Sequence, residues 1–349
     1  GGMTIHRDPE ASTHLARKLW PRFNGRPVLV ALPFTADALP LLRATGSPVT
    51  AWHHDHAAYR ADPGPGVFAA EPPAGSFGAG LLFLPKEREL SGWAMEAVAG
   101  RLEPGAPVLV VGPNRGGIRA AGPAVEHGVG PIEETVSGGH CRAIFARVRR
   151  EASQRTVPLP MVSFGAGAPD DAVTVCSVPG VFAHGSVDPG SRLLLDVLRD
   201  APPAGPVLDW GCGNGVLGAV LSARDPELRV VATDRNAFAL EAARATLAAN
   251  RPERVRLVPG SRMEDLPGGF GTVVTNPPFH EHIRSDASAT QRFLAGTRDL
   301  LLPGGRLVLV ANRFLKYPEV LVQSGARVRV AAETDRFRVI EASWPVERE

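Results

Sequence analysis

The segment Asn276-Pro277-Pro278-Phe279 carries residue types that can hold a planar amine. An amine on an aromatic base or an amide is a poor nucleophile, because its lone pair is delocalised. The side-chain oxygen of Asn276 and the carbonyl of Pro277 are two acceptors for its two N–H bonds, and proline stiffens the backbone there. Phe279 offers a face on which a planar base can stack. The segment therefore predicts a pocket for a planar NH₂ group rather than a simple strand-ending turn.

A second chemical signal lies in residues 206–223, "PVLDWGCGNGVLGAVLSA", which read as a strand, a glycine-rich turn and a helix. Within them, residues 213–218 match the pattern G-x-G-x-x-G, whose glycines let the backbone approach a nucleotide. Asp234 ends the next expected strand, about 20 residues further on, where a carboxylate can accept both ribose hydroxyls. Together these features predict a cofactor that contains adenosine.

The acidic residue Asp209, directly before the glycine-rich turn, indicates which cofactor this is. Its charge would oppose the pyrophosphate of a nicotinamide dinucleotide. It would suit the ammonium and sulfonium groups of S-adenosylmethionine. The order of Asp209, Trp210, a G-x-G-x-G turn and then Asp234 therefore favours the methyl donor.

Four expected strands place these groups at one edge of a parallel sheet. Counted from the glycine-rich turn, they are residues 206–209, 228–234, 254–259 and 271–275. Ligands of open α/β sheets bind outside the carboxyl ends of the strands, at the point where the strand order reverses. We expect the fourth strand beside the first at that point, which places Asn276 next to the methyl group of the cofactor. Asn236 is expected to cap the helix that follows the second strand.

The first half of the chain shows a similar alternation but lacks such a site. Expected strands are 27–32, 80–84 and 107–112, with a helix over 91–105. None of these strands leads into a glycine-rich turn with an acidic partner, and "GPNRGGIRAAG" (112–122) offers two arginines instead. We expect a domain of similar fold that is structural or contacts RNA. Residues 150–175 read as a connector, and we divide the chain into domains 1–155 and 156–349.

Three histidines and an aspartate stand close together in "WHHDHAAYR", residues 52–60. Neighbouring residues of an extended segment alternate between faces, and no distant set of ligands completes a metal shell. We therefore expect a polar loop or strand end there, without a metal.

Composition limits the class of protein. With 349 residues, 44% hydrophobic and 21% charged, the chain is long enough for two globular domains, and its net charge of +2 excludes a polycation. No apolar run approaches the roughly 20 residues of a membrane span, and no signal-peptide pattern opens the chain. Three widely spaced cysteines without a CxxC pair favour a reducing compartment. We expect a cytoplasmic monomer that does not bind membranes.

The second half is similar to class I methyltransferases, and in detail it resembles the ribosomal RNA guanine-N2 methyltransferases of the RsmC/RlmG type. The segments that carry the resemblance are "PGVF" (179–182), "DPGSRLLL" (188–195), "LDWGCGNGVLG" (208–218), "NPPFH" (276–280) and "VANRFLKYPEVL" (310–321). In the first half they are "GPNRGGIRAA" (112–121) and "HCRAIFARV" (140–148). The resemblance implies an α/β protein of two tandem Rossmann-like domains. The second would be catalytic, with a mostly parallel seven-stranded sheet, and the first a degenerate duplicate without a cofactor site.

The resemblance also implies that S-adenosylmethionine methylates the N2 amine of a guanine in ribosomal RNA or a ribosomal subunit. The implied cofactor-binding residues are Asp188, Ser191, Asp209, Gly211, Gly213, Gly215, Asp234, Arg235, Ser261 and Asn276. Asn276, Pro277 and Phe279 would grip the guanine, and His280 would line the substrate. Two residues depart from the family pattern: Trp210 replaces a small aliphatic residue, and Ser261 stands where Asp or Asn usually contacts the adenine.

Two other functions stay open. Adenine-N6 and protein-glutamine methyltransferases also use Asn/Asp-Pro-Pro with an aromatic residue, but they usually have Tyr at the position of Phe279 and lack the duplicated first half. A non-catalytic RNA-binding or ribosome assembly factor with the same fold belongs to another class. The presence of Asp209, Asp234 and Asn276 argues against it.

Overall fold

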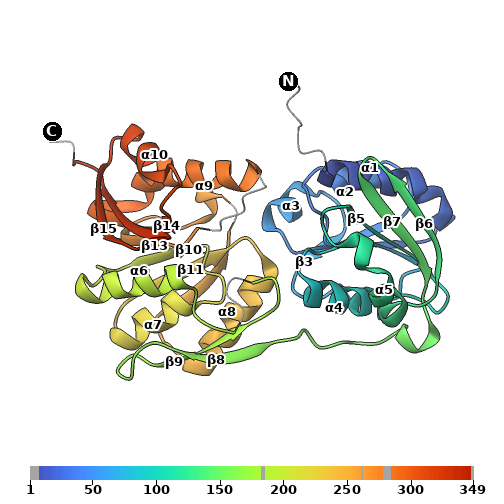
Figure 1. Cartoon of the computed structure of the whole chain (residues 1–349), viewed down its shortest axis with the longest axis horizontal. Coiled ribbons are helices and arrows are strands. Elements are labelled where there is room, and N and C mark those ends of the chain that lie inside the picture. The colour runs from blue at the N-terminus through green and yellow to red at the C-terminus, as the bar shows by residue number, and fades with distance from the viewer. Residues whose placement is uncertain (1–7, 182–184, 261, 278–283, 347–349) are drawn as a thin grey trace. The chain divides into compact units, whose positions relative to one another are not determined.

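The computed structural model describes residues 8–181, 185–260, 262–277 and 284–346 (Figure 1). It divides the chain into two compact units. Unit 1 comprises Gly1–Pro160 and Val178–Gly180, and unit 2 comprises Met161–Ser177 and Val181–Glu349.

Unit 2 is built on one mostly parallel sheet, which in the described residues has seven strands in the order β12-β11-β10-β13-β14-β16-β15. The strands are β10 (Val207–Trp210), β11 (Val230–Asp234), β12 (Val255–Pro259), β13 (Phe270–Thr275), β14 (Leu301–Asn312), β15 (Arg327–Glu333) and β16 (Phe337–Ser343). β16 runs antiparallel to β14 and β15, and the other neighbours are parallel. The fourth expected strand does lie beside the first, with Trp210 paired to Thr275.

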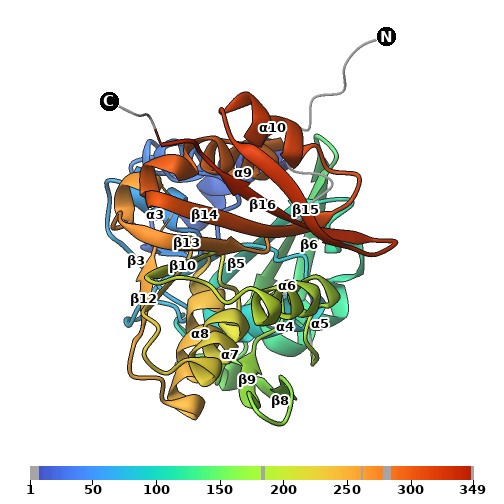
Figure 2. The same ribbon diagram turned by 90° about the vertical axis from the view of Figure 1, so that its left-hand side faces the viewer.

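Helices cover both faces of this sheet (Figures 1 and 2). On one face lie α6 (Pro189–Asp200), α7 (Val216–Arg224) and α8 (Ala237–Asn250), and on the other α9 (Arg284–Gly296) and α10 (Tyr317–Gln323). Unit 2 also contains two short 3-10 helices, η4 (Met263–Asp265) and η5 (Thr297–Leu300). Asn236 caps α8 as expected, since its side chain accepts a hydrogen bond from Phe238 N.

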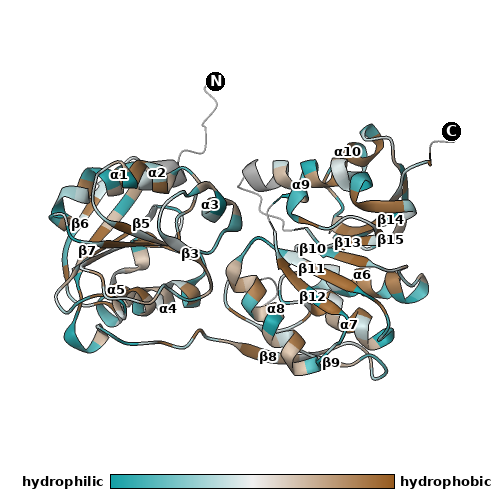
Figure 3. Ribbon diagram, turned by 180° about the vertical axis from the view of Figure 1, so that it is seen from behind, coloured by the Kyte–Doolittle hydropathy of each residue, from teal (hydrophilic) through white to brown (hydrophobic). Residues whose placement is uncertain are grey.

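The alternation of side chains along β14 explains why both faces need a cover. Val308 and Val310 are fully buried in the cluster that includes α6 and α7, whereas Leu307 and Leu309 are fully buried in the cluster on the opposite face. Successive residues of a strand point to opposite faces, so a run of apolar residues implies burial on both sides. Figure 3 shows brown, hydrophobic ribbon along the central strands, and helices that carry both brown and teal segments.

Unit 1 has a seven-stranded sheet of its own, in the order β3-β2-β1-β4-β5-β7-β6 for the described residues. Its strands are β1 (Val28–Ala31), β2 (Val49–His53), β3 (Gly66–Phe68), β4 (Ala79–Phe83), β5 (Pro107–Pro113), β6 (Ile132–Gly138) and β7 (Cys141–Arg147). Its helices are α1 (Asp8–Leu19), α2 (Ala38–Arg43) and α3 (His56–Ala61) on one face, with α4 (Arg88–Ala99) and α5 (Gly122–Gly128) on the other (Figure 1). The 3-10 helices are η1 (Trp20–Phe23), η2 (Ile118–Ala120) and η3 (Arg150–Ala152).

The two sheets share one topology, strand by strand. In both, the first strand pairs with the second and fourth, and the last strand in sequence runs antiparallel between the fifth and sixth. The distribution of helices over the two faces is also the same. The predicted fold class, two tandem methyltransferase-type domains, is confirmed.

One part of the predicted connector is regular structure. β8 (Val162–Ala166) and β9 (Val173–Ser177) form an antiparallel pair within the stretch taken as a connector. The Gly- and Pro-rich residues around them hide their alternation in the sequence. The pair is fixed by α8, because Thr246 Oγ1 accepts from Cys176 N at 2.9 Å and Asn250 Oδ1 accepts from Thr174 N at 2.9 Å.

Among the helices described, none combines the length and apolar character needed to cross a membrane.

Candidate active site

The loop between β10 and α7 needs its glycines. Gly211, Gly213 and Gly215 have φ angles of 71°, 54° and 82°, in the left-handed region that side chains disfavour. A Cβ atom on Gly215 would also lie 3.3 Å from the Cα and Cβ atoms of Ala243 in α8. At these three glycines the loop before α7 therefore presents backbone without side chains, which is the arrangement that lets a nucleotide approach closely.

Asp234, at the end of β11, ties the loop to the second strand. Its Oδ2 atom accepts from Gly213 N at 2.9 Å, and its Oδ1 atom accepts from Asn236 N at 2.9 Å. Burial raises the pKa of Asp234, and these two hydrogen bonds oppose the rise. The next residue, Arg235, is half-buried. Each carboxylate oxygen keeps a further lone pair, so the group can still accept from two hydroxyls.

Asp209 is a fully buried carboxyl group at the carboxyl end of β10. Neither of its oxygens has a hydrogen-bond partner among the described residues. Burial, followed by the charge of Asp234, raises its pKa to about 7. An uncompensated buried charge is costly, so this site favours either a protonated carboxyl group or a cation bound beside it.

Asn276 has a fixed orientation. Its Nδ2 atom donates to Asp188 Oδ2 at 3.0 Å and to Ser191 Oγ at 2.9 Å. The carboxylate of Asp188 can only accept, so the amide nitrogen must face it and the amide oxygen must lie on the other side of the planar group. The side chain of Asn276 therefore offers a hydrogen-bond acceptor away from α6.

The start of α6 reaches Asn276 because of its own sequence. Asp188 is the N-cap residue and accepts from Ser191 N at 3.0 Å, and Pro189 occupies the first turn, where its missing N–H is harmless. A Cβ atom on Gly190 would lie 2.9 Å from Asp188 Oδ2 and 3.5 Å from Asn276 Nδ2. A side chain at this position would therefore crowd the Asp188 carboxylate that accepts from Asn276. From the sequence alone Gly190 had no expected role, although it lies within the Asp-Pro-Gly-Ser segment of residues 188–191.

The unusual residue Trp210 is explained by packing. Its ring stacks on Phe293 of α9, with the centroids 3.9 Å apart and the planes at 5°. Its carbonyl accepts from Thr275 Oγ1 at 2.7 Å, which joins the ends of β10 and β13 directly before Asn276. No sequence pattern marks Phe293, because this contact forms only when the chain folds.

Unit 1 lacks these groups at the matching positions. Val28 of β1 pairs with Val49 and Ala79, as Val207 of β10 pairs with Val230 and Thr272. Counting along each strand from these pairs gives the matches. In unit 1, Val30 occupies the position that matches Asp209. His53 occupies the position of Asp234, and Phe83 that of Asn276.

His53 belongs to a buried polar network of unit 1. Its Nε2 atom lies 2.9 Å from Asp62 Oδ2, and Arg43 binds both oxygens of Asp62 at 2.8 and 2.9 Å. Burial lowers the pKa of His53. Burial alone would raise the pKa of Asp62, but hydrogen bonds from Arg43, His53 and Gly64 N outweigh it and lower that pKa. His53, which occupies the position that matches Asp234, is therefore bound within unit 1 itself.

Residues 52–60 are the end of β2 and the start of α3, with Asp55 as the N-cap. Within the ranges described above, no three His, Cys, Asp or Glu side chains gather in a way that would hold a metal ion.

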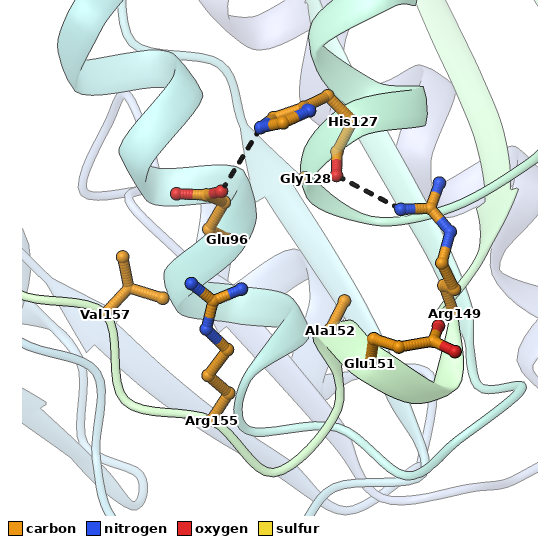
Figure 4. A pocket seen from close by; sticks show the side chains of 8 residues that line it. All are labelled: Glu96, His127, Gly128, Arg149, Glu151, Ala152, Arg155 and Val157. Carbon is orange, nitrogen blue, oxygen red and sulfur yellow. Dashed lines mark hydrogen bonds and ion pairs between the residues drawn. The ribbon is translucent and has the colours of Figure 1, made fainter.

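A pocket of unit 1 lies away from any cofactor-type position (Figure 4). Its lining includes Glu96 near the end of α4 and His127 near the end of α5, whose side chains are 3.7 Å apart. Arg149 donates to the carbonyl of His127 at 3.3 Å. Helices that follow parallel strands run back toward the amino ends of the sheet, so this pocket lies at the opposite edge from the one where such sheets bind ligands.

Comparisons with known proteins match both halves of the chain. Residues 172–341 match the family "Methyltransferase small domain", and residues 12–157 match "Methyltransferase small domain N-terminal". A relative from Ectopseudomonas mendocina, named Ribosomal RNA small subunit methyltransferase C, is 38% identical over 323 residues, which are 92% of this chain and 95% of that protein. A relative of the same name from Pseudomonas aeruginosa is 38% identical over 280 residues, 80% of this chain and 83% of that protein.

This chain belongs to the ribosomal RNA small subunit methyltransferase C family. A solved structure of T. Thermophilus 16S rRNA N2 methyltransferase (RsmC), in complex with AdoMet and guanosine, is similar with a TM-score of 0.83 and 24% identity. The match covers 99% of this chain and 94% of that chain, so both units share its fold.

Most of the residues expected from the sequence for a methyltransferase C site lie at one edge of the unit 2 sheet. They are Asp188, Ser191, Asp209, Gly211, Gly213, Gly215, Asp234, Arg235 and Asn276. Pro277 is buried directly after Asn276. Ser261, Phe279 and His280 lie outside the described residues.

Proposed function

We propose that this chain transfers a methyl group from S-adenosylmethionine to the exocyclic N2 amine of a guanine in the RNA of the small ribosomal subunit. Membership of the methyltransferase C family supports the reaction type and the RNA. The observation that carries the proposal is the orientation of Asn276, whose hydrogen bonds to Asp188 and Ser191 direct its amide oxygen away from α6. An acceptor held there suits an NH₂ group on a planar base.

The residues of unit 2 fit the cofactor. Asp209 is a buried carboxyl group without a partner among the described residues, and a bound cation would compensate its charge. The glycine loop leaves room for the adenosine, and Asp234 keeps lone pairs for two ribose hydroxyls. When bound, S-adenosylmethionine supplies an electrophilic methyl group on a sulfonium. In this proposal, Gly211, Gly213 and Gly215 line the cofactor, Arg235 lies beside its ribose, and Ser261 faces the adenine.

The protein holds the amine rather than activating it with a strong base. Asn276 Oδ1 and the Pro277 carbonyl accept its two N–H bonds, so that the lone pair points out of the base plane toward the methyl group. The negative charge of Asp188 on the amide nitrogen polarises Asn276 and strengthens its oxygen as an acceptor. In the proposal, Phe279 stacks on the guanine and His280 lines its pocket.

The proposal gives the two domains, 1–155 and 156–349, different tasks. The second domain binds the cofactor and the target guanine. The first, which has Val30 and His53 in place of the two acidic residues, contributes to binding of the RNA. The exposed Arg115 and Arg119 after β5 are available for phosphates. The proposal also places the enzyme in the cytoplasm as a monomer, and light scattering of the purified chain tests the oligomeric state.

The test is transfer of labelled methyl groups to unmodified small-subunit RNA and to unmodified subunits, followed by digestion and identification of the nucleoside. We expect N2-methylguanosine. N6-methyladenosine, or label in protein glutamine, would replace the proposal by one of the two alternative methyltransferases. Binding of S-adenosylmethionine without transfer to either substrate would favour a non-catalytic assembly factor.

A further inference from the structure

Phe314 is an exposed aromatic residue at the carboxyl end of β14. Its exposure of 82% is the highest among the large hydrophobic residues that the structure describes. β14 lies next to β13, whose end carries Asn276, and it extends three residues beyond Leu309, the partner of Thr275. Phe314 thus stands at the same edge of the sheet as the proposed active site. An exposed aromatic ring at such a position offers a face on which a nucleic-acid base can stack.

Hydrogen bonds hold the backbone of the loop that carries Phe314, so the position of its exposed ring is restricted. Asn312 Oδ1 accepts from Phe314 N at 3.0 Å, and the carbonyl of Asn312 accepts from Leu315 N at 3.0 Å. The carbonyl of Leu315 in turn accepts from Arg338 Nη2 at 3.1 Å. A preorganised loop loses little conformational entropy when a ligand binds it.

A series of contacts links this loop to the neighbourhood of Asn276. Arg313 N donates to the carbonyl of Arg336 at 3.0 Å, and the Arg336 guanidinium lies 5.1 Å from the ring centroid of Phe337. A Cβ atom on Gly190 would lie 3.5 Å from Phe337 Cε1 and equally far from Asn276 Nδ2. Phe337 is therefore a neighbour of the residue that we propose grips the guanine.

The charges on the surface around this loop suit a nucleic acid. Its cations are Arg313, Lys316 and Arg336, all of them exposed. The acidic groups beside them are Glu333, which pairs with Arg313 at 3.1 Å, and the exposed Asp335. Two aromatic rings between cations are the combination that single-stranded RNA requires, because bases stack on the rings while phosphates meet the cations.

We propose that Phe314, with Phe337 and the cations Arg313, Lys316 and Arg336, binds the single-stranded RNA that flanks the target guanine. Phe314 stacks on a neighbouring base, and the cations contact its phosphates. This inference rests on the proposed function, since it assigns the flanking strand of the same substrate. It makes Phe314 a residue that selects single-stranded or opened RNA over a closed helix, whose bases are not available for stacking.

The experiment measures RNA binding separately from methyl transfer, using the full chain. Binding of a short fluorescent single-stranded RNA with one guanine is compared for wild type, Phe314→Ala and Phe314→Trp, with S-adenosylmethionine affinity measured in parallel. Loss of one base stack is expected to weaken RNA binding by about five-fold to about a hundred-fold, and Trp is expected to retain it. Lys316→Ala and Arg336→Ala should each reduce the log–log salt slope by up to about 0.7. Cofactor affinity should stay unchanged in every variant.

Two matched controls lie at the opposite edge of the same sheet. Leu302→Ala removes an exposed apolar side chain near the start of β14, and Arg327→Ala removes an exposed cation at the start of β15. Both variants should bind RNA as the wild type does. In methyl transfer to unmodified RNA, Phe314→Ala should raise KM for the RNA more than it lowers kcat, because Phe314 does not contact the reacting amine.

The outcomes separate this inference from the proposed function. If the wild type binds RNA but transfers no methyl group, the function fails while the RNA affinities still test the surface. If Phe314→Ala binds the RNA as tightly as the wild type, the inference is overturned. The inference is also overturned if Phe314→Ala binds and methylates naked RNA normally but is impaired on assembled subunits. The surface would then contact a ribosomal protein.

Discussion

At the residue scale, Asp209 is a carboxyl group whose charge depends on what lies beside it. It is fully buried, and burial together with Asp234 raises its pKa to about 7. In the unfolded chain its pKa would be near 3.9. The raised value means that protonated Asp209 favours folding, and that this contribution is lost as the pH rises through about 7. A cation bound beside it favours the carboxylate, so binding below pH 7 must release a proton.

We therefore expect the affinity for S-adenosylmethionine to rise with pH up to about 7 and to level off above it. Asp209→Asn should bind the cofactor more weakly. Its affinity should also rise less with pH, and the rise that remains would come from Asp234. Calorimetry across this pH range, in buffers of different ionisation enthalpy, measures both the affinity and the proton release. The exposed Asp196→Asn variant is the control. An affinity of the wild type that is independent of pH would contradict the role given to Asp209.

At the element scale, the β10–α7 loop shows why one position needs glycine for two reasons. Gly215 has φ 82°, and a Cβ there would also crowd Ala243 at 3.3 Å. Gly325 has φ 91° with nothing within 4 Å of its Cβ position. Comparing the two separates backbone strain from crowding.

Gly325→Ala is expected to lower the free energy of unfolding by about 1–2 kcal/mol, the cost of a left-handed residue with a side chain. Gly215→Ala should lower it further, because α7 and α8 must also move apart. Urea unfolding of both variants measures the difference. Equal losses in the two variants would show that the contact with Ala243 does not constrain the loop.

The elements show how far the sequence predicts this structure. The four strands around the loop and the cap at Asn236 followed from local patterns, because strand ends and caps are set by neighbouring residues. The β8–β9 pair was missed, since its hydrogen bonds to Thr246 and Asn250 join residues far apart in sequence. For the same reason the contact of Trp210 with Phe293 and the close approach of Gly190 to Asn276 were not predictable.

At the scale of the whole molecule, the chain holds the same domain topology twice, but in the described residues the two acidic side chains Asp209 and Asp234 have no counterpart in the first domain. The second strand of the first domain ends in His53, which is bound to Asp62, where the second domain has Asp234. The sequence predicts that the first domain has lost this site, because the missing glycine-rich turn and acidic partner are local features, and this loss stays a prediction. It gave no indication of the buried network of Arg43, Asp62 and His53, whose members meet only in the folded domain.

We therefore expect one S-adenosylmethionine per chain. Asp234→Ala should weaken that binding by roughly 1.5–3 kcal/mol, since it removes hydrogen bonds to a charged acceptor. Because the first domain is expected to hold no cofactor, this variant should show no second site that binds with wild-type affinity. Asp62→Asn should lower thermal stability, because it leaves Arg43 partly buried without its carboxylate, yet leave cofactor affinity unchanged. Calorimetric stoichiometry and thermal unfolding test both statements. Two cofactors bound per chain would contradict the degenerate assignment of the first domain.

The central claim is that the Asn276 amide oxygen holds the amine that receives the methyl group. Its most direct test is single-turnover methyl transfer to small-subunit RNA by wild type and Asn276→Ala, with cofactor binding measured in parallel. We predict that the variant binds S-adenosylmethionine nearly as the wild type does, while transfer falls by about 10²-fold or more, as for other losses of one preorganised polar group at a reacting centre. Transfer at the wild-type rate by Asn276→Ala would contradict the account.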